Sequence, residues 1–254
     1  MQKALNNLLV LPVTWLISCV SIILLSIFLF TLSFMPRALG GRYYHYLSRL
    51  WCRLFVRCLR VDLKLVNNSQ QEIPEKYILI ANHPSAFEDF SIPALFDIYP
   101  LAKVGVRDWF LLGRISDFAG TIFVERDSSD SRYQALKSLI DATKSGKNMA
   151  IFPEGGCKGR YIYERFHTGA FEVSLRTGLP ILPVYLHYID QDTFEWTKQT
   201  LLQKLWQIFL SNNNRVNYYV HDVLDPSQFS DKQQYAEYAH DLFSGWQSLY
   251  NDAD

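Results

Sequence analysis

A histidine and two acids stand close together directly after the apolar run Tyr77-Ile78-Leu79-Ile80-Ala81. The segment reads Asn82-His83-Pro84-Ser85-Ala86-Phe87-Glu88-Asp89. An imidazole titrates near neutrality, so His83 is suited to take a proton from an alcohol. A carboxylate on the other ring nitrogen would fix the tautomer and stabilise the imidazolium that forms. The segment predicts a hydroxyl-activating base at His83, and the spacing alone leaves Glu88 and Asp89 both open as its partner.

The local sequence predicts where the histidine lies relative to the next helix. Pro84 is well placed as the first helical residue, which leaves His83 at the cap. Residues five apart inside a helix lie on different faces, so only a histidine outside the helix can turn back to Glu88 or Asp89. No G-x-S-x-G elbow surrounds Ser85, so we do not expect it to act as a nucleophile.

Two later segments combine apolar runs with groups that bind anions. Arg126 follows the strand-like run Thr121 to Val124 and is suited to grip a phosphate, with a surface salt bridge to Glu125 or Asp127 as the alternative. The segment Phe152-Pro153-Glu154-Gly155-Gly156 ends in paired glycines, which let a backbone approach a ligand closely. An ordinary tight turn is the alternative for these glycines. The apolar segment Gly178 to Val184 is expected to form a hydrophobic wall.

In this order the motifs resemble those of the glycerolipid acyltransferase family, of the lysophosphatidic acid acyltransferase type. That family carries N-H-x4-D, a block ending in arginine, F-P-E-G-T-R-S and an apolar V-P-x-x-P-V-like segment. The resemblance covers Val61 to His187 and extends to the apolar N-terminus. It implies an O-acyltransferase that moves a fatty acyl chain from acyl-CoA or acyl carrier protein to the free hydroxyl of a lysophospholipid. The leading acceptor is 1-acylglycerol-3-phosphate, which would give phosphatidic acid.

The resemblance also implies roles for individual residues. His83 would deprotonate the acceptor hydroxyl, and Glu88, at the position of the family's aspartate, would orient His83. The residues implied to bind the acceptor are Arg126, Glu154, Gly155 and Gly156, with Asp89 and Lys158 as possible support. Backbone amides near the glycines would stabilise the oxyanion. No metal, cofactor or acyl-enzyme is expected, and Cys157 is not expected to act as a nucleophile because no second base is placed beside it by motif.

Departures from the family pattern bear on the acceptor. The segment that corresponds to F-P-E-G-T-R-S runs from Phe152 to Lys158. It has Gly156 and Cys157 where the family has threonine and arginine. Another lysolipid, a lyso-aminolipid or a lipid A-type acceptor is therefore an alternative, as is a non-catalytic lipid-binding homologue.

The N-terminus predicts a membrane segment. No charged residue lies between Asn7 and Arg37, and Leu8 to Met35 as one helix would be about 42 Å long at ~1.5 Å per residue. Because a hydrocarbon core is about 30 Å thick, the segment is long enough to cross it, although Pro12 leaves a re-entrant helix open. Arginines follow the segment and only Lys3 precedes it, which places the remaining chain in the cytoplasm. We expect residues 42–60, rich in arginine and aromatics, to lie at the headgroups of an inner or cytoplasmic membrane; the alternative is a helix packed on the domain.

The rest of the chain alternates apolar runs with polar helical stretches. This pattern predicts an α/β fold with a single mixed or mostly parallel sheet flanked by helices. The expected division is a membrane anchor and interfacial helix at 1–60 and a catalytic domain at 61–254. The 254 residues carry a net charge of zero, which gives no reason to expect nucleic acid as a partner. The expected partners are the lysolipid, the acyl donor and membrane lipid.

Overall fold

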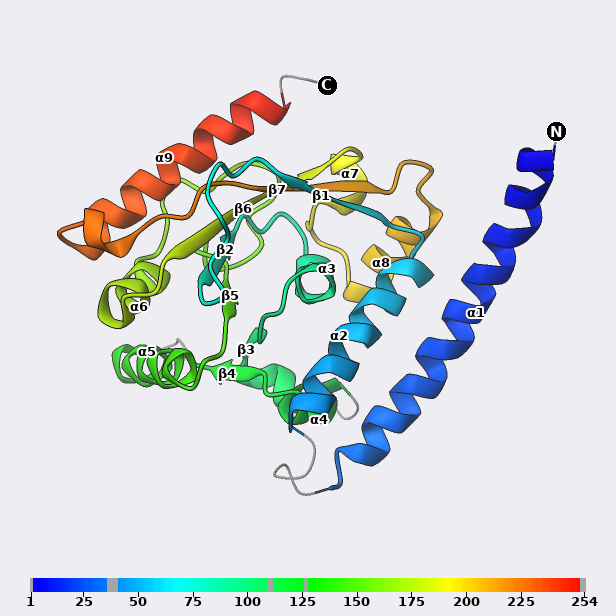
Figure 1. The fold of residues 1–254 in the computed structure, drawn as a ribbon, viewed down its shortest axis with the longest axis horizontal. Helices are drawn as coiled ribbons and strands as arrows, with labels where there is room; N and C mark the ends of the chain where they lie inside the picture. The colour runs from blue at the N-terminus through cyan, green and yellow to red at the C-terminus, as the bar shows by residue number, and fades with distance from the viewer. Residues whose placement is uncertain (1, 36–40, 109–111, 126–127, 252–254) are drawn as a thin grey trace.

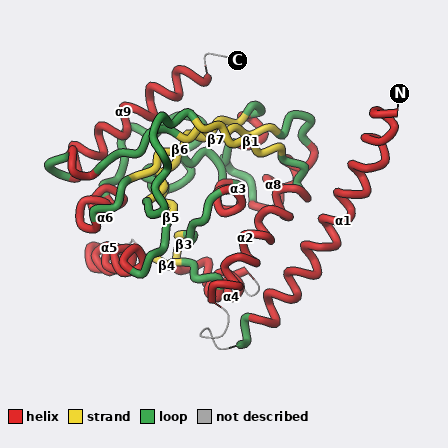
Figure 2. Tube along the Cα trace, in the orientation of Figure 1, coloured by secondary structure: helices red, strands yellow, loops and turns green. Residues whose placement is uncertain are grey.

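The computed structural model describes residues 2–35, 41–108, 112–125 and 128–251. A five-stranded sheet lies at its centre, in the order β1-β7-β6-β2-β5 (Figures 1 and 2). The strands are β1 (Asp62–Asn67), β2 (Ile78–Ala81), β5 (Met149–Ile151), β6 (Ile181–Tyr188) and β7 (Arg215–Val220). Only β6 and β7 pair antiparallel in this sheet, and the remaining pairs are parallel. The fold confirms the predicted α/β class with a mostly parallel sheet.

Two short strands extend this arrangement beyond β5. Strands β3 (Leu101–Lys103) and β4 (Ile122–Val124) pair in parallel as a separate two-stranded sheet. A parallel bridge between Tyr99 and Met149 links the approach to β3 with β5. The sequence predicted one sheet, and the observed division arises because β3 lies next to β5 only at this bridge.

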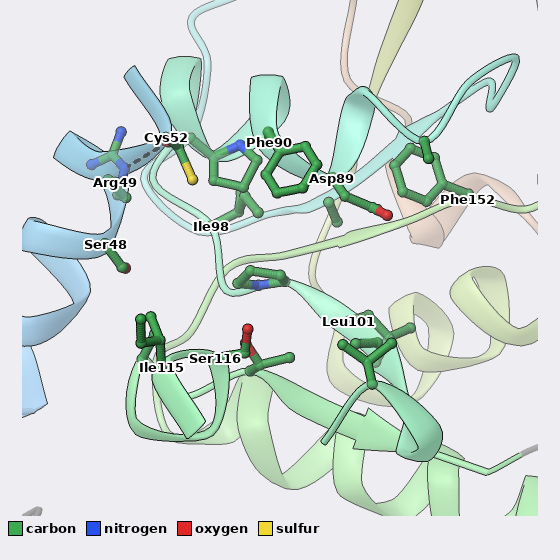
Figure 3. A pocket seen from close by; sticks show the side chains of 18 of the residues that line it. Ser48, Arg49, Cys52, Asp89, Phe90, Ile98, Leu101, Ile115, Ser116 and Phe152 are labelled. Carbon is green, nitrogen blue, oxygen red and sulfur yellow. Dashed lines mark hydrogen bonds between the residues drawn. The ribbon is translucent and has the colours of Figure 1, made fainter. Parts of the chain in front are cut away.

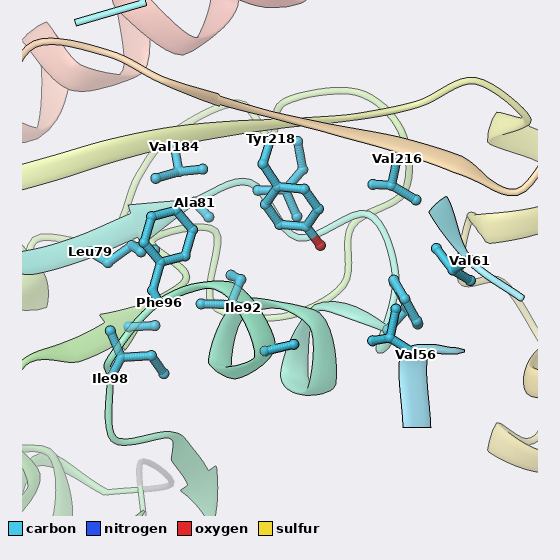
Figure 4. Close-up of a cluster of buried hydrophobic side chains, with 14 of the residues drawn as sticks. Val56, Val61, Leu79, Ala81, Ile92, Phe96, Ile98, Val184, Val216 and Tyr218 are labelled. Carbon is cyan, nitrogen blue, oxygen red and sulfur yellow. The ribbon is translucent and has the colours of Figure 1, made fainter. Parts of the chain in front are cut away.

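The central strands are buried on both faces. Leu79 and Ala81 of β2 pack with Val184, Tyr218 and Ile92 (Figure 4). Ile78 and Ile80 point to the opposite face, where helices α5 (Ser129–Lys144), α6 (Gly169–Thr177) and α9 (Lys232–Asn251) contribute. Successive side chains of a strand alternate between faces, so a strand covered on both sides is apolar throughout. This explains the unbroken run before His83.

The N-terminal helices pack along the domain. Helix α1 (Gln2–Leu32) runs outside α2 (Gly41–Cys58), and α2 packs against α3 (Glu88–Leu95) (Figure 1). Tyr44 Oη donates to the Leu29 carbonyl at 2.9 Å, and the Trp51 indole donates to Ser26 Oγ at 2.8 Å. Among the described residues, one helical stretch, Val13–Leu32, is long and apolar enough to cross a membrane. The division of the chain at residue 60 stays a prediction.

Two arginines of helix α2 donate hydrogen bonds to α3. Arg49 Nε donates to the Pro93 carbonyl at 3.2 Å, and Arg53 Nε donates to the Ala94 carbonyl at 2.9 Å. These oxygens belong to the last turn of α3, where helical carbonyls lack partners within the helix. These hydrogen bonds join α2 to the end of α3, although Arg53 is also exposed. The position of α2 as a whole relative to a membrane stays a prediction.

The helix after the histidine begins later than predicted. Helix α3 begins at Glu88, and Pro84 lies in the preceding loop. The Ser85 amide donates to Glu88 Oε1 at 3.0 Å, and the Phe87 amide donates to Ser85 Oγ at 3.3 Å. These side-chain bonds stabilise a turn in place of a first helical turn. His83 nevertheless lies outside the helix, as predicted.

Several short helices had no counterpart in the sequence reading. They are the 3₁₀ segments at Val104–Asp108 and Pro226–Gln228, α4 (Leu112–Phe118), α7 (Gln191–Phe194) and α8 (Leu201–Leu210). Helices this short show little of the periodicity that sequence analysis depends on.

Candidate active site

His83 and Glu88 form a close pair at the end of β2. His83 Nδ1 lies 3.3 Å from Glu88 Oε2, and the Glu88 side chain is fully buried. A carboxylate at this nitrogen favours the tautomer with the proton on Nδ1, which leaves Nε2 as the basic atom. The His83 ring also stacks on Phe152, with ring centroids 3.9 Å apart. The pair therefore has the geometry of an oriented general base.

Glu88 accepts hydrogen bonds from a tyrosine distant in sequence and from a nearby backbone amide. Tyr188 Oη, at the end of β6, donates to Glu88 Oε1 at 2.5 Å, and the Ser85 amide donates to the same oxygen. Asn82 connects the same two strands, because its side chain exchanges hydrogen bonds with the backbone of Leu186 at 3.0 and 2.8 Å. Parallel pairing of β2 with β6 brings these residues together. No local signal identifies Tyr188, which lies 100 residues after Glu88.

Glu154 is a positioning residue in this structure. Its side chain is buried, and Oε1 accepts from the His83 amide at 2.8 Å while Oε2 accepts from the Tyr163 amide at 3.2 Å. Glu154 is absent from the described cavity wall. Both carboxylate oxygens face backbone amides, and the predicted role in binding the acceptor stays a prediction. Glu154 connects the loop after β5 to the backbone that carries the candidate base.

Asp89 lies next to Glu88 but faces a different direction. It lines the cavity (Figure 3), and His83 belongs to the same wall. Desolvation raises the pKa of Asp89 to about 6, although the residue is exposed at the cavity; the His83 charge lowers this pKa, and the Glu88 charge raises it. No hydrogen bond joins Asp89 to His83 among the described contacts. The structure therefore brings Glu88, and not Asp89, into contact with the imidazole.

Cys157 lies against the basic nitrogen. Its Sγ is 3.4 Å from His83 Nε2. Burial raises the pKa of the Cys157 thiol, and the interaction with His83 lowers it only in part. The direction of the hydrogen bond between Sγ and Nε2 depends on the protonation state of the ring. The base beside Cys157 is the candidate general base His83 itself, because the loop after β5 folds back onto it.

The paired glycines line the cavity next to this contact. Gly155 has a φ of +79°, and a Cβ there would come within 2.7 Å of the His167 ring. A side chain at this position would be strained, so glycine is required. Gly156 has open space around its Cα. Both glycines are thus placed as the sequence predicted, at a backbone that a ligand can approach.

The predicted basic groups are not all at this site. Lys158 Nζ lies 4.5 Å from the Tyr163 ring centroid, and Arg160 binds Glu195 and Asp192. Neither side chain lines the cavity among the described residues. Arg126 lies outside the described residues, so its predicted role stays a prediction.

A mostly apolar cavity of about 610 Å³ begins at this site. It extends from Asp89 and Phe152 past Phe90 and Leu101 to Ser48 and Arg49 of α2 (Figure 3). Its walls come from α2, α3, β3 and α4, so α2 belongs to the wall of the cavity. A cavity with one catalytic pair at its end and apolar side chains along its length suits a chain molecule with a reactive polar end.

The pH dependence follows from the surroundings of His83. Burial alone lowers the pKa of His83, but the hydrogen bonds to Cys157 and Glu88 and the charges of Glu88 and Asp89 outweigh burial and place the pKa well above its ordinary value. A base must be neutral, and the neutral fraction rises as the pH rises through the pKa. We expect the acid limb of kcat/KM to lie above the range of an ordinary histidine. Asp89→Asn removes one raising charge and should move the limb to lower pH; an unmoved limb would contradict this account.

Known proteins resemble both the sequence and the fold. The Acyltransferase family model matches residues 63–187. A lysophosphatidylcholine acyltransferase of Drosophila melanogaster is 31% identical over 157 residues, covering 59% of this chain and 29% of the relative. The lyso-ornithine lipid O-acyltransferase of Pseudomonas aeruginosa is 31% identical over 143 residues, covering 56% of this chain and 54% of the relative.

The likeness in fold extends over the whole chain. The crystal structure of the 1-acyl-sn-glycerophosphate acyltransferase of Thermotoga maritima superposes with a TM-score of 0.68 at 21% identity, covering 99% of this chain and 98% of that one. The matched regions of the two curated relatives are 29% and 54% of their lengths. Residues 63–187 match the Acyltransferase family, and the chain is similar to glycerolipid acyltransferases in sequence and to one of them in fold.

Proposed function

We propose that this protein transfers a fatty acyl chain from an acyl thioester to the free hydroxyl of a lysophospholipid. The observation that carries the proposal is the buried His83–Glu88 pair at the end of an apolar cavity. The similarity to relatives that are named as acyltransferases of lysolipids supports the proposal. The thioester is that of acyl-CoA or acyl carrier protein, and no cofactor takes part.

The proposed chemistry is a direct transfer. His83 Nε2 takes the proton from the acceptor hydroxyl, and the resulting nucleophile attacks the thioester carbonyl. Glu88 stabilises the imidazolium through Nδ1. Collapse of the tetrahedral intermediate expels the thiolate, which receives the proton from His83. The Cys157 thiol must move away from Nε2 for the acceptor hydroxyl to approach.

The apolar cavity is proposed to hold the acyl chain. Its wall next to His83 is formed by Phe152, Gly155 and Gly156, and its far part by residues of α2 and α4. Removing a long hydrocarbon chain from water is favourable in proportion to the apolar area buried. A chain with its carbonyl at His83 would extend from the glycines toward Ser48 and Arg49.

The acceptor headgroup has two candidates. The resemblance favours 1-acylglycerol-3-phosphate, with phosphatidic acid as product. Two observations favour a zwitterionic or amine-bearing headgroup. The acid Asp89 faces the cavity. The basic side chains of Lys158 and Arg160 contact Tyr163, Glu195 and Asp192 instead of lining the cavity. An unpaired acid near the reaction centre repels a phosphate monoester and attracts a cation.

The membrane is proposed to contact the outer face of α1. The inner face of α1 contacts the rest of the protein. The Trp15 indole donates a hydrogen bond to the Cys58 carbonyl at 2.9 Å, and Arg114 donates to Ser33 Oγ, just after the helix, at 2.9 Å. The outer face exposes apolar residues, among them Val13, Leu16, Ile17, Val20, Ile23 and Leu24. If α1 crossed the bilayer upright, the domain packed on it would enter the hydrocarbon as well. We therefore place α1 along one leaflet of an inner or cytoplasmic membrane, with the catalytic site facing the cytoplasm.

A panel of lysolipids tests the proposed function. Purified protein is assayed with acyl-CoA and with acyl carrier protein against lysophosphatidic acid, lysophosphatidylcholine, lysophosphatidylethanolamine and a lyso-aminolipid. We expect esterified product from at least one acceptor, and the preferred acceptor decides between the two headgroup classes. Binding of lysolipids without product from any pair would support the non-catalytic alternative.

Arg126 gives a prediction from the sequence alone. If its guanidinium grips the acceptor phosphate in the ground state, Arg126→Ala should raise the acceptor KM about tenfold with little change in kcat. Arg126→Lys should recover only part of the loss, because an ammonium cannot bind a phosphate in two parallel bonds. Steady-state kinetics against acceptor concentration provide the test. An unchanged KM contradicts the role.

Cys157 gives a prediction that separates direct from covalent transfer. Because direct transfer needs no thiol, Cys157→Ala should keep turnover within about fivefold of the parent. Mass spectrometry after incubation with donor alone should show no acyl adduct. A loss of about a hundredfold or more together with an acylated Cys157 in the parent would replace direct transfer by a thioester intermediate.

A further inference from the structure

Helix α8 has its polarity reversed relative to an ordinary surface helix. Its outward stripe consists of Leu202, Trp206 and Leu210, which are 79%, 61% and 57% exposed. These residues are four apart and therefore follow one line along the helix. A second apolar set, which includes Ile208, packs into the core on the other side. Surface helices of soluble proteins normally present charged and polar residues outward.

The charge of α8 is turned inward. Its sequence Leu201–Leu210 contains one charged residue, Lys204, and this side chain is 1% exposed. Lys204 Nζ donates to the Thr193 carbonyl at 2.9 Å. The described outward positions beside the apolar stripe are the uncharged Gln203 and Gln207. An outer surface with a tryptophan, two leucines and no charge is suited to the boundary between lipid headgroups and acyl chains.

Helix α8 also contacts both α1 and the wall of the cavity. The Phe209 ring centroid is 5.8 Å from Trp15 of α1 and 5.6 Å from Trp206. At its first residue, Leu201 lines the cavity together with Trp196. Figure 1 shows α8 beside α2, with α1 on the outside. Helix α8 therefore packs against α1 at Trp15 through Phe209 and reaches the cavity wall at Leu201.

We propose that α8 is a second membrane-binding element, which inserts Leu202, Trp206 and Leu210 into the leaflet that also holds α1. The proposal rests on the proposed function in one respect, that the lysolipid comes from the bilayer. The arrangement brings the cavity wall at Leu201 and Trp196 to the lipid surface. A lysolipid could then pass from the leaflet to His83 without fully entering water.

Vesicle binding tests the proposal with a matched pair of variants. Leu202→Gln, Trp206→Gln and Leu210→Gln are combined in one protein. The control combines Tyr133→Gln, Tyr238→Gln and Leu249→Gln, three exposed apolar positions on α5 and α9. On vesicles of phosphatidylethanolamine and phosphatidylglycerol, we expect the α8 variant to bind about tenfold or more weakly and the control within about twofold of the parent. Equal binding by parent and α8 variant overturns the proposal.

A second measurement keeps the test independent of folding and of catalysis. In vesicles that contain brominated phosphatidylcholine, part of the tryptophan emission of the parent should be quenched. In Trp206→Phe the quenched part of the emission should be smaller, because Trp206 contributes to it in the parent. If Trp206→Phe is quenched by the same amount as the parent, α8 does not insert. Neither measurement uses acyl donor or lysolipid, so a negative result in the lysolipid panel leaves this test unaffected. Where transfer is detectable, kcat on a monomeric short-chain lysolipid should be unchanged in the α8 variant.

Discussion

Replacing His83 by alanine should reduce acyl transfer by about a thousandfold, because a positioned general base contributes roughly 10² to 10⁴ in rate. The loss should appear in kcat as well as in kcat/KM, since the proton transfer occurs in the transition state. His83→Gln is the second variant, because a glutamine keeps much of the volume against Phe152 and still cannot act as a base. Initial rates with saturating donor and acceptor provide the measurement.

Two controls make the His83 result specific. Vesicle binding by His83→Ala should equal that of the parent, because the residue is buried and belongs to neither α1 nor α8. His221→Gln removes another histidine, which stacks on Trp246 and is absent from the described cavity wall, and should leave turnover nearly unchanged. Near-normal turnover in a folded His83→Ala protein would remove the proposed mechanism.

Glu88 and Asp89 should differ sharply when each is replaced. Glu88→Gln keeps the size of the side chain and an oxygen for Tyr188, but removes the charge that stabilises the imidazolium. We expect a loss of about a hundredfold or more in kcat, compared with about fivefold or less for Asp89→Asn. The reason is geometric, because Glu88 Oε2 lies 3.3 Å from His83 Nδ1 and Asp89 faces the cavity.

Replacement of Glu88 should also change the pH dependence of the reaction rate. The Glu88 charge and hydrogen bond raise the pKa of His83, so what activity remains in Glu88→Gln should have its acid limb at lower pH than the parent. A purely structural role for Glu88 would reduce activity without moving the limb. Glu88→Asp, which restores the family's residue, should recover part of the rate if the shorter side chain can reach Nδ1. A larger loss in Asp89→Asn than in Glu88→Gln would transfer the orienting role to Asp89.

Local sequence determined much of the scaffold of this protein. The unbroken apolar run before His83 forms β2, a strand covered on both faces, and the alternation of apolar runs with polar helical stretches predicted the α/β class. These features depend on side-chain polarity and on turn residues a few positions apart. The loop that contains His83 was placed correctly outside a helix, although its hydrogen bonds through Ser85 delay the helix to Glu88.

The sequence by itself determined the α/β class and the apolar N-terminus and predicted His83 as the base, because each depends on residue types at short spacing. Only the tertiary structure decided between Glu88 and Asp89, placed Cys157 at Nε2 and turned Glu154 to the His83 backbone. It also showed Tyr188 as the group that holds Glu88. These contacts join residues up to 100 positions apart, and they depend on how parallel strands align their carboxyl ends. No periodicity or motif within one segment carries that alignment.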